Sequence, residues 1–104
     1  VAVDVGTEST RAAVFDAMGN KLASHCAPHT TFYPQAGWAE QRPEDWWLGL
    51  GKAVRGALSE SGLPPEEVAA ICMATTSCTV MACDHNGEPL RPALLWMDAR
   101  SAPQ

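Results

Sequence analysis

The sequence predicts an α/β fold whose sheet mixes antiparallel and parallel strands. Two apolar, strand-like runs, 11–17 and 21–30, are separated only by Met18-Gly19-Asn20, and strands joined by so short a turn must be antiparallel. One amphipathic helix follows these strands, and further strand-like runs come after the helix. Strands reached through a helix can pair in parallel with earlier ones, which gives a mixed sheet.

The first element is the short apolar run Val1–Val5, which contains one aspartate and is followed by the polar residues 6–10. This pattern is typical of a buried strand that ends in a turn. After the strands at 11–17 and 21–30, residues 31–42 contain Pro34 and Gly37 and are predicted to form an irregular connection.

The sequence predicts one long helix that begins at Pro43 and is stopped by Gly62. Proline suits the first helical position, and Glu44 and Asp45 place negative charge at the positive end of the helix dipole. Apolar residues recur every three or four positions, as expected for a stripe that faces a core. The stripe consists of Trp47, Leu50, Val54, Ala57 and Leu58.

Three strand-like runs follow the helix, at 68–75, 79–83 and 90–96, and Pro92 confines the last one to an edge or an irregular stretch. The pattern Asp-x-x-Gly-x-x-Leu occurs twice, from Asp16 to Leu22 and from Asp84 to Leu90. We interpret it as two similar hairpin turns rather than as a structural repeat.

Composition excludes several classes of protein. The chain has 104 residues, of which 46% are hydrophobic and 18% charged, and this balance is typical of a globular domain rather than a disordered one. A net charge of −5 without a basic stripe argues against nucleic acid or an anionic membrane as a partner. No apolar run approaches the ~18 residues that a membrane span needs.

Cysteine usage favours a reducing, cytoplasmic compartment. Three of the four cysteines lie in apolar, strand-like sequence, where a free thiol behaves as a small buried hydrophobe. His25, Cys26 and His29 form one candidate metal cluster, although ordinary side chains on a strand or loop are the favoured interpretation.

Polar residues follow the first predicted strand in the run Asp4-Val5-Gly6-Thr7-Glu8-Ser9-Thr10-Arg11. Gly6 lets the backbone approach a ligand closely, and the hydroxyls of Thr7 and Ser9 can donate hydrogen bonds. The Arg11 guanidinium can neutralise phosphate oxygens, and the Asp4 carboxylate can hold Mg²⁺ through water. The run therefore indicates a phosphate and metal site, with a solvated turn as the alternative.

Two tryptophan-containing segments are the other candidates. Trp38 is expected to anchor a loop, while Trp46 and Trp47 are expected to pack the helix against the sheet. In the run 96–100, an indole at Trp96 beside the carboxylate of Asp98 can form a platform for a sugar. The alternative for this run is a helix start with an Asp cap and an ion pair.

Together these segments resemble the FGGY family of carbohydrate kinases. The family's Asp-x-Gly-Thr-x-Ser-x-Arg pattern is met at residues 4–11, and its Gly-Trp-x-Glu-Gln segment before an acidic, Trp-containing helix is met at 37–47. Its Asp-x-x-Gly-x-Pro-Leu turn leading to Trp-x-Asp-x-Arg is met at 84–100. The three patterns occur in the family's order and span almost the whole chain.

The resemblance implies an enzyme with two domains of the actin-like, ribonuclease-H-like type that binds ATP and a sugar in the cleft between them. Residues 1–104 would be the N-terminal part of the first domain, with the remainder of that domain and the second domain absent. The implied activity is transfer of the γ-phosphate of MgATP to a hydroxyl of a small-molecule sugar or polyol. The implied location is cytoplasmic, and a homodimer is left open.

The resemblance also gives each motif a role. Asp4 would lie near the metal ion, and the residues expected at the ATP phosphates are Gly6, Thr7, Ser9 and Arg11. The residues expected at the substrate are Thr76, Ser77, Cys78, Trp96 and Asp98. The family's catalytic base is an Asp well beyond residue 104, so residues 1–104 alone are expected to be inactive.

The segment 75–79 bears on the substrate. Glycerol kinases carry an Arg-Glu pair where Ser77 and Cys78 stand, and xylulose kinases carry a Gln-Met-His-Gly run that is also absent here. A segment rich in Thr, Ser and Cys is similar to the ribulokinase-like branches, which implies a ketopentose such as ribulose or xylulose. The alternatives are a non-catalytic, actin-like module that binds a nucleotide or a sugar, and a pseudokinase.

Overall fold

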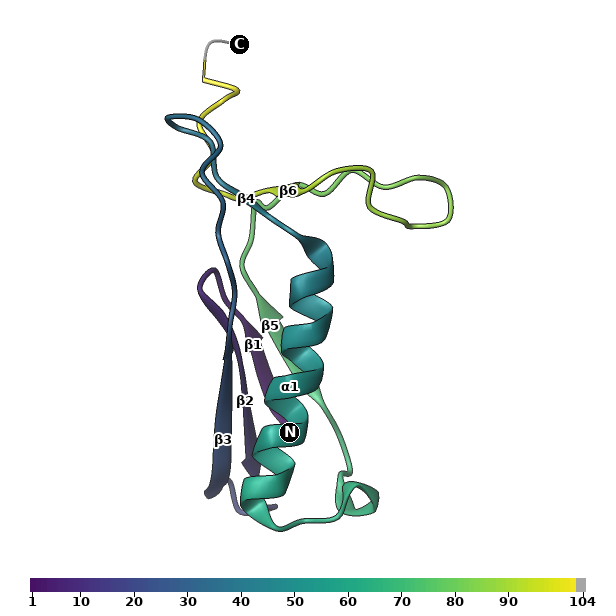
Figure 1. Cartoon of the computed structure of the whole chain (residues 1–104). Helices are drawn as coiled ribbons and strands as arrows, with labels where there is room; N and C mark the ends of the chain where they lie inside the picture. Colours follow the sequence, from purple (N-terminus) through teal and green to yellow (C-terminus); the bar gives the residue numbers. More distant parts are fainter. Residues whose placement is uncertain (103–104) are drawn as a thin grey trace.

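The computed structural model describes residues 1–102, which form two small sheets and one long helix (Figure 1). The larger sheet has the strand order β3-β2-β1-β5. Strand β1 pairs antiparallel with β2 and parallel with β5, while β2 and β3 are antiparallel, so the predicted mixed sheet is confirmed. The four strands are β1 (Ala2–Val5), β2 (Ser9–Phe15), β3 (Lys21–Pro28) and β5 (Cys72–Thr75).

The long helix α1 (Pro43–Ser61) has the predicted ends. Pro43 occupies its first position, where the missing N–H costs no hydrogen bond. Gly62 follows the helix with a φ of +71°, and its N–H donates to the carbonyl oxygens of Leu58 and Ser59. A left-handed residue that returns its N–H to the last turn is the usual way to end a helix.

The core lies between α1 and one face of the larger sheet, as the helix lying along the strands shows (Figure 1). Small side chains dominate this interface and let the helix approach the strands closely. The buried core residues are Val3, Ala12, Val14 and Ala27 from the strands and Ala53 and Ala57 from α1. Because side chains alternate along a strand, Asp4 lies on the sheet face opposite α1.

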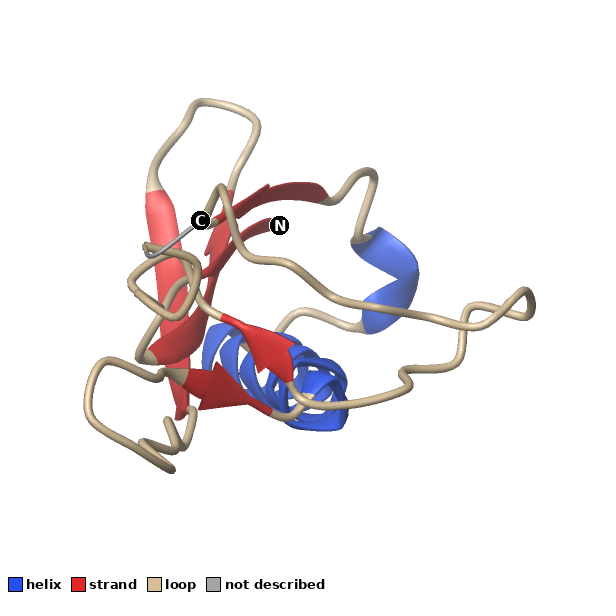
Figure 2. Cartoon of the chain, turned by 90° about the horizontal axis from the view of Figure 1, so that it is seen from above, coloured by secondary structure: helices blue, strands red, loops and turns tan. Residues whose placement is uncertain are grey.

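A second sheet consists of β4 (Glu40–Gln41) and β6 (Ala93–Leu94), of which β6 is the part of the predicted strand 90–96 that forms, whereas β4 was not predicted. It lies across the end of α1 when the molecule is viewed from above (Figure 2). The strand predicted at 79–83 is wrong, since only isolated bridges occur there, at Val80 and Cys83. A 3₁₀ turn, η1 (Pro65–Glu67), follows α1, and the strand run predicted at 68–75 shortens to β5, because its pairing with β1 begins only at Cys72, opposite Ala2.

The recurring Asp-x-x-Gly pattern forms two turns of the same construction, as predicted. In each, the aspartate Oδ1 accepts hydrogen bonds from the backbone N–H groups two and four residues later, at Asp16 and again at Asp84. Gly19 and Gly87 both have a φ of +86°, which favours glycine.

Two side-chain predictions are wrong. Trp47 is 75% exposed and points away from the core, so only Trp46 of the tryptophan pair turns inward. The four cysteines are free, but all are exposed rather than buried. For Cys72 the reason is that β5 lies at the edge of the sheet, beyond the strands that α1 covers.

Within residues 1–102, no helix is both long enough and apolar enough to cross a membrane.

Candidate functional site

The candidate site lies where the parallel strands β1 and β5 end side by side. Their register pairs Val5 with Thr75, so the segments 6–8 and 76–79 leave the sheet at the same edge. The Thr76 N–H donates to the Val5 carbonyl oxygen over 3.2 Å, which continues the pairing past the end of β5. Ligands of α/β proteins commonly bind outside the carboxyl ends of parallel strands.

Asp4 and Arg11 form an ion pair on the sheet face opposite α1. They lie directly across from each other on β1 and β2, and Arg11 Nη1 donates to Asp4 Oδ2 over 3.1 Å. Both side chains are more than half exposed, so both remain accessible to a ligand. The structure thus brings together the predicted metal-binding carboxylate and a predicted phosphate-binding guanidinium.

Gly6 lies directly over this ion pair. A Cβ atom at this position would lie 3.3 Å from the Ser9 carbonyl oxygen and 3.4 Å from Arg11 Nη1. The Gly6 N–H donates to the Ser9 carbonyl oxygen over 3.0 Å and closes the turn between β1 and β2. Glycine therefore leaves room beside the pair that a larger residue would take up.

Thr7 is held from two sides. Its hydroxyl oxygen accepts a hydrogen bond from Trp96 Nε1 over 3.1 Å, and its carbonyl oxygen accepts one from Gln41 Nε2 over 2.6 Å. Ser9, in contrast, is buried. A contact between the Ser9 hydroxyl and phosphate stays a prediction, and the burial of Ser9 does not support it.

A pocket of about 260 Å³ opens beside the strand ends. Gly6 and Thr76, both predicted from the sequence, line it together with Gln41 and Trp46, which sequence reasoning missed as site residues. Thr79 also lines the pocket, and its buried Oγ1 has no hydrogen-bond partner among the described residues. An unpaired buried hydroxyl in a pocket wall is available to a polar ligand.

Ser77 and Cys78 continue from Thr76 around an exposed turn. Cys78 has a φ of +62°, which is uncommon for a residue other than glycine. Such backbone strain is frequent at ligand-binding sites.

Trp96 and Asp98 have different environments. Trp96 is 56% exposed, which leaves its ring available for a ligand. The Asp98 side chain is only 3% exposed, and its oxygens accept hydrogen bonds from the Ala39 N–H and from the backbone and guanidinium of Arg100. A direct contact between Asp98 and a sugar stays a prediction that this geometry does not favour.

The Asp98–Arg100 pair belongs to a network that fixes the segment carrying Trp96. Hydrogen bonds from Arg100 hold the pKa of Asp98 well below its usual value, and the same bonds raise the pKa of Arg100. Arg100 and Arg91 each donate a hydrogen bond to Glu40 Oε1 over 2.8 Å. The Arg100 guanidinium also stacks on the Trp38 ring, 3.8 Å from its centre. Trp38 therefore anchors a loop, as predicted.

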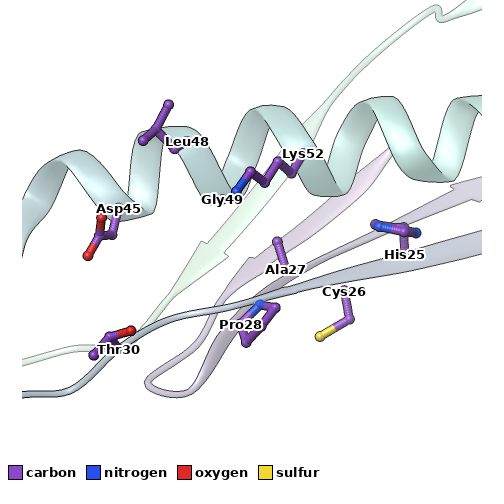
Figure 3. A pocket seen from close by; sticks show the side chains of 9 residues that line it. All are labelled: His25, Cys26, Ala27, Pro28, Thr30, Asp45, Leu48, Gly49 and Lys52. Atoms are coloured by element: carbon purple, nitrogen blue, oxygen red, sulfur yellow. The ribbon is translucent and has the colours of Figure 1, made fainter.

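A separate pocket of about 290 Å³ lies between β3 and the first turns of α1 (Figure 3). Its lining includes His25, Asp45 and Lys52 but none of the predicted phosphate or substrate residues. Figure 3 shows His25 and Ala27 directed toward α1 and Cys26 directed away from it, so His25 and Cys26 do not face a common point. The described residues hold no group of three or more potential metal-ligating side chains.

A magnesium ion beside the strand ends would have one protein carboxylate, that of Asp4, and would need phosphate oxygens and water for its other ligands. Asp4 supplies one exposed carboxylate, of which Oδ2 is paired with Arg11. Mg²⁺ in nucleotide sites is commonly bound by one or two carboxylates, phosphate oxygens and water rather than by a cage of protein ligands.

The sequence model for the FGGY family of carbohydrate kinases, N-terminal domain, matches residues 1–104. The chain belongs to the FGGY family of carbohydrate kinases. Its actin-like, ribonuclease-H-like fold is that of the family's solved structures, which confirms the predicted family and fold class. The crystal structure of a xylulose kinase from Rhodospirillum rubrum has a TM-score of 0.87 and 26% identity, and the match covers 97% of this chain and 21% of that one.

Relatives of this FGGY chain include kinases with different substrates. A xylulose kinase of Streptomyces coelicolor is 44% identical over 105 residues, which is 100% of this chain and 21% of the relative. A glycerol kinase of Roseobacter denitrificans is 39% identical over 103 residues, which is 98% of this chain and 21% of the relative. The chain thus spans about a fifth of the length of the relatives that it matches.

Proposed function

We propose that the protein carrying this chain transfers the γ-phosphoryl group of ATP to a hydroxyl of a sugar or polyol. The observation that carries the proposal is the direct contact between Trp96, on the predicted sugar side, and Thr7, in the predicted phosphate loop. The membership of residues 1–104 in a family of carbohydrate kinases supports it. A site that joins the two substrates at one loop suits phosphoryl transfer, where positioning provides much of the catalysis.

The phosphate side of the proposed site is the turn between β1 and β2. Arg11 and the Thr7 hydroxyl would bind phosphate oxygens, and Gly6 would let them approach the backbone. Ser9 would support the turn through its carbonyl oxygen, which already accepts the Gly6 N–H. Asp4 would hold Mg²⁺, which when bound neutralises charge on the transferred phosphoryl group.

The substrate side is the segment 76–78, in which Thr76 is half-buried and Ser77 and Cys78 are exposed, together with Trp96. We propose that the Trp96 ring packs against the sugar carbons, while Thr76, Ser77 and Cys78 face its hydroxyl groups. Asp98 would not contact the sugar but would hold the segment that carries Trp96 in place through its bond with Arg100. The proposed substrate is a ketopentose such as ribulose or xylulose, because 76–78 offers neutral hydroxyl and thiol groups rather than a charged pair.

The base that accepts the proton of the attacking hydroxyl is proposed to be an aspartate outside residues 1–104, the usual role of a carboxylate in this chemistry. Residues 1–104 alone are therefore expected to show no turnover. The cytoplasmic location and the homodimer remain predictions.

Sugar-dependent ADP release by the complete protein tests the proposal. With MgATP, release should rise at least several-fold when ribulose or xylulose is added, and less with glycerol. Trp96→Ala should raise the KM for the sugar, whereas Trp47→Ala, at a tryptophan 75% exposed on α1, is the matched control and should leave it unchanged. Release that is identical across a broad panel of ketoses and polyols would favour a non-catalytic binding module or a pseudokinase.

A further inference from the structure

Gln41 is a buried amide whose hydrogen bonds reach three other segments. Its side chain stands at the end of β4 and is 1% exposed. Nε2 donates to the Thr7 carbonyl oxygen over 2.6 Å and to Thr31 Oγ1 over 2.8 Å. Oε1 accepts a hydrogen bond from Trp46 Nε1 over 2.8 Å, so both donor hydrogens and the acceptor are used.

The partners of Gln41 determine which way its amide points. The Trp46 indole can only donate, and the Thr7 carbonyl can only accept. Rotating the amide by half a turn would place two donors against each other at Trp46 and two acceptors against each other at Thr7. The amide therefore has one satisfied orientation, and neither a carboxylate nor an apolar side chain can replace it.

Holding the Thr7 carbonyl also fixes the next N–H group. The peptide bonds of the described chain contain no cis linkage, and in a planar trans peptide the carbonyl and the following N–H point in opposite directions. With the Thr7 oxygen held by Gln41, the Glu8 N–H is directed to the opposite side of the turn. Gln41 thereby sets the direction of a backbone donor in the loop 6–8.

Gln41 is also close to the substrate side. It lines the 260 Å³ pocket together with Gly6 and Thr76. Its indole partner, Trp46, belongs to the first turn of α1, so the start of the helix, the pocket wall and the loop 6–8 are joined by a single side chain.

We propose that Gln41 is a positioning residue that holds the loop 6–8 in the conformation that binds the phosphates of the nucleotide. This inference rests on the proposed function, since it assigns the loop to ATP. Because protein groups already engage the polar atoms of Gln41, it would act through the Thr7 carbonyl, and Trp46 would act one step further away by keeping the amide in its orientation.

The test is Gln41→Glu in the complete protein, since this change keeps the shape but replaces both donor hydrogens with an acceptor facing the Thr7 carbonyl. We expect the Kd for ADP and the KM for ATP to rise about tenfold, which corresponds to the loss of one hydrogen bond and an unpaired acceptor. The KM for the sugar should rise less than the KM for ATP, because the change reaches Trp96 only through its hydrogen bond to Thr7. Trp46→Phe, which removes the indole donor together with part of the ring volume but keeps Gln41 itself, should give a smaller effect in the same direction.

Thr31→Val is the matched control. It removes the other acceptor of the same amide but leaves the bond from Gln41 to Thr7 in place. If the role of Gln41 were purely structural, nucleotide affinity would follow thermal stability. Thr31→Val and Gln41→Glu proteins with the same loss of thermal stability would then show the same loss of nucleotide affinity. That result, or an unchanged Kd for ADP in a folded Gln41→Glu protein, would overturn the proposal.

Amide hydrogen exchange at residues 6–8 separates this inference from the kinase proposal. Exchange without nucleotide should accelerate in Gln41→Glu and in Trp46→Phe but not in Thr31→Val. If the unmodified protein bound no ADP, the proposed function would fail, whereas unchanged exchange in both Gln41→Glu and Trp46→Phe would contradict the positioning role itself.

Discussion

The indole Nε1 of Trp96 donates a hydrogen bond to the hydroxyl of Thr7 over 3.1 Å. The two residues are 89 positions apart, and each belongs to a different family motif. Their contact joins the segment proposed to face the sugar to the loop proposed to face the phosphates. Each substrate would therefore influence the residue that binds the other.

This contact predicts coupling between the two sides of the site. Trp96→Phe keeps an aromatic face but removes the donor, so the KM for ATP should rise about three- to tenfold through the loosened Thr7 hydroxyl. Thr7→Val should remove the same bond from the other end. In steady-state kinetics of the complete protein, the double variant should therefore be little worse than the poorer single variant, and fully additive effects would show that the contact is not functional.

Asp4→Ala should lower turnover strongly, because it removes the proposed magnesium ligand. It should hardly affect folding, since an exposed ion pair contributes only about 0–1 kcal/mol. Turnover against magnesium concentration and the thermal midpoint measure the two effects. Activity that survives within a few-fold would show that Asp4 does not hold the metal.

Asp98→Asn should affect stability and sugar binding together. It weakens the buried pair with Arg100, whose bonds keep the pKa of Asp98 below its usual value. The pKa of Asp98 is lower in the folded protein than in the unfolded chain. The pair therefore stabilises the folded protein at pH values above the pKa of the unfolded chain, which include neutral pH. This stabilisation should be lost as strongly acidic conditions are reached. The thermal midpoint should fall by more than in Asp4→Ala, and equal midpoints would contradict a structural role for the network.

Two glycines of α1 should respond to alanine in opposite directions. At Gly51 a new Cβ meets only the flexible end of Arg55, so Gly51→Ala should stabilise the helix by about 0.5–1 kcal/mol. At Gly56 it would overlap the ring of His25, so Gly56→Ala should destabilise by about 1–3 kcal/mol. Thermal or urea unfolding measures both, and the same sign for the two variants would show that β3 does not pack closely on α1.

His29 should make the contact between β3 and α1 sensitive to pH. Burial lowers its pKa below the ordinary 6.5, although the nearby Asp45 opposes this, and Nε2 is paired with the hydroxyl of Thr10. The unfolded chain therefore takes up the proton first, so stability should be full above about pH 6.5 and should fall as the pH drops below it. The protection factors of amides in β3 and α1, which correct exchange for its intrinsic dependence on pH, should fall between roughly pH 7 and 5.5, and His29→Gln should flatten that fall.

Local signals in the sequence predicted the elements that local chemistry specifies. Pro43 and Gly62 set the ends of α1, and the aspartates at positions 16 and 84 set the two turns. The antiparallel pairing of β2 and β3 followed from the short turn between them.

Long-range partners were not predictable in the same way. The pairing of β4 with β6 joins residues more than 50 positions apart, and two-residue strands carry no periodicity. The apolar run at 79–83 is typical of a strand, but only two of its residues form bridges. Trp47 fitted the helical stripe, but its position faces solvent in the folded chain.

The candidate site shows the same division. Asp4, Arg11 and Trp96 could be named as candidates from motifs read along the chain, but the ion pair between Asp4 and Arg11 and the exposure of Trp96 are seen only in the structure. Gln41 was visible only as part of a motif, and its role depends on Thr7, Thr31 and Trp46 meeting at one point. For Asp98 the alternative read from the sequence, an ion pair within the run 96–100, is confirmed by its bonds to Arg100, whereas the bond from the distant Ala39 N–H could not be predicted.

The proposed phosphoryl transfer is tested by supplying the complete protein with ATP labelled in its γ-phosphoryl group, together with ribulose, xylulose or glycerol, and identifying the labelled product. The label should appear on the sugar, a ketopentose should be labelled faster than glycerol, and Asp4→Ala should abolish most of the labelling. Label found only in ATP or in inorganic phosphate, whichever sugar or polyol is present, would contradict the proposed kinase activity.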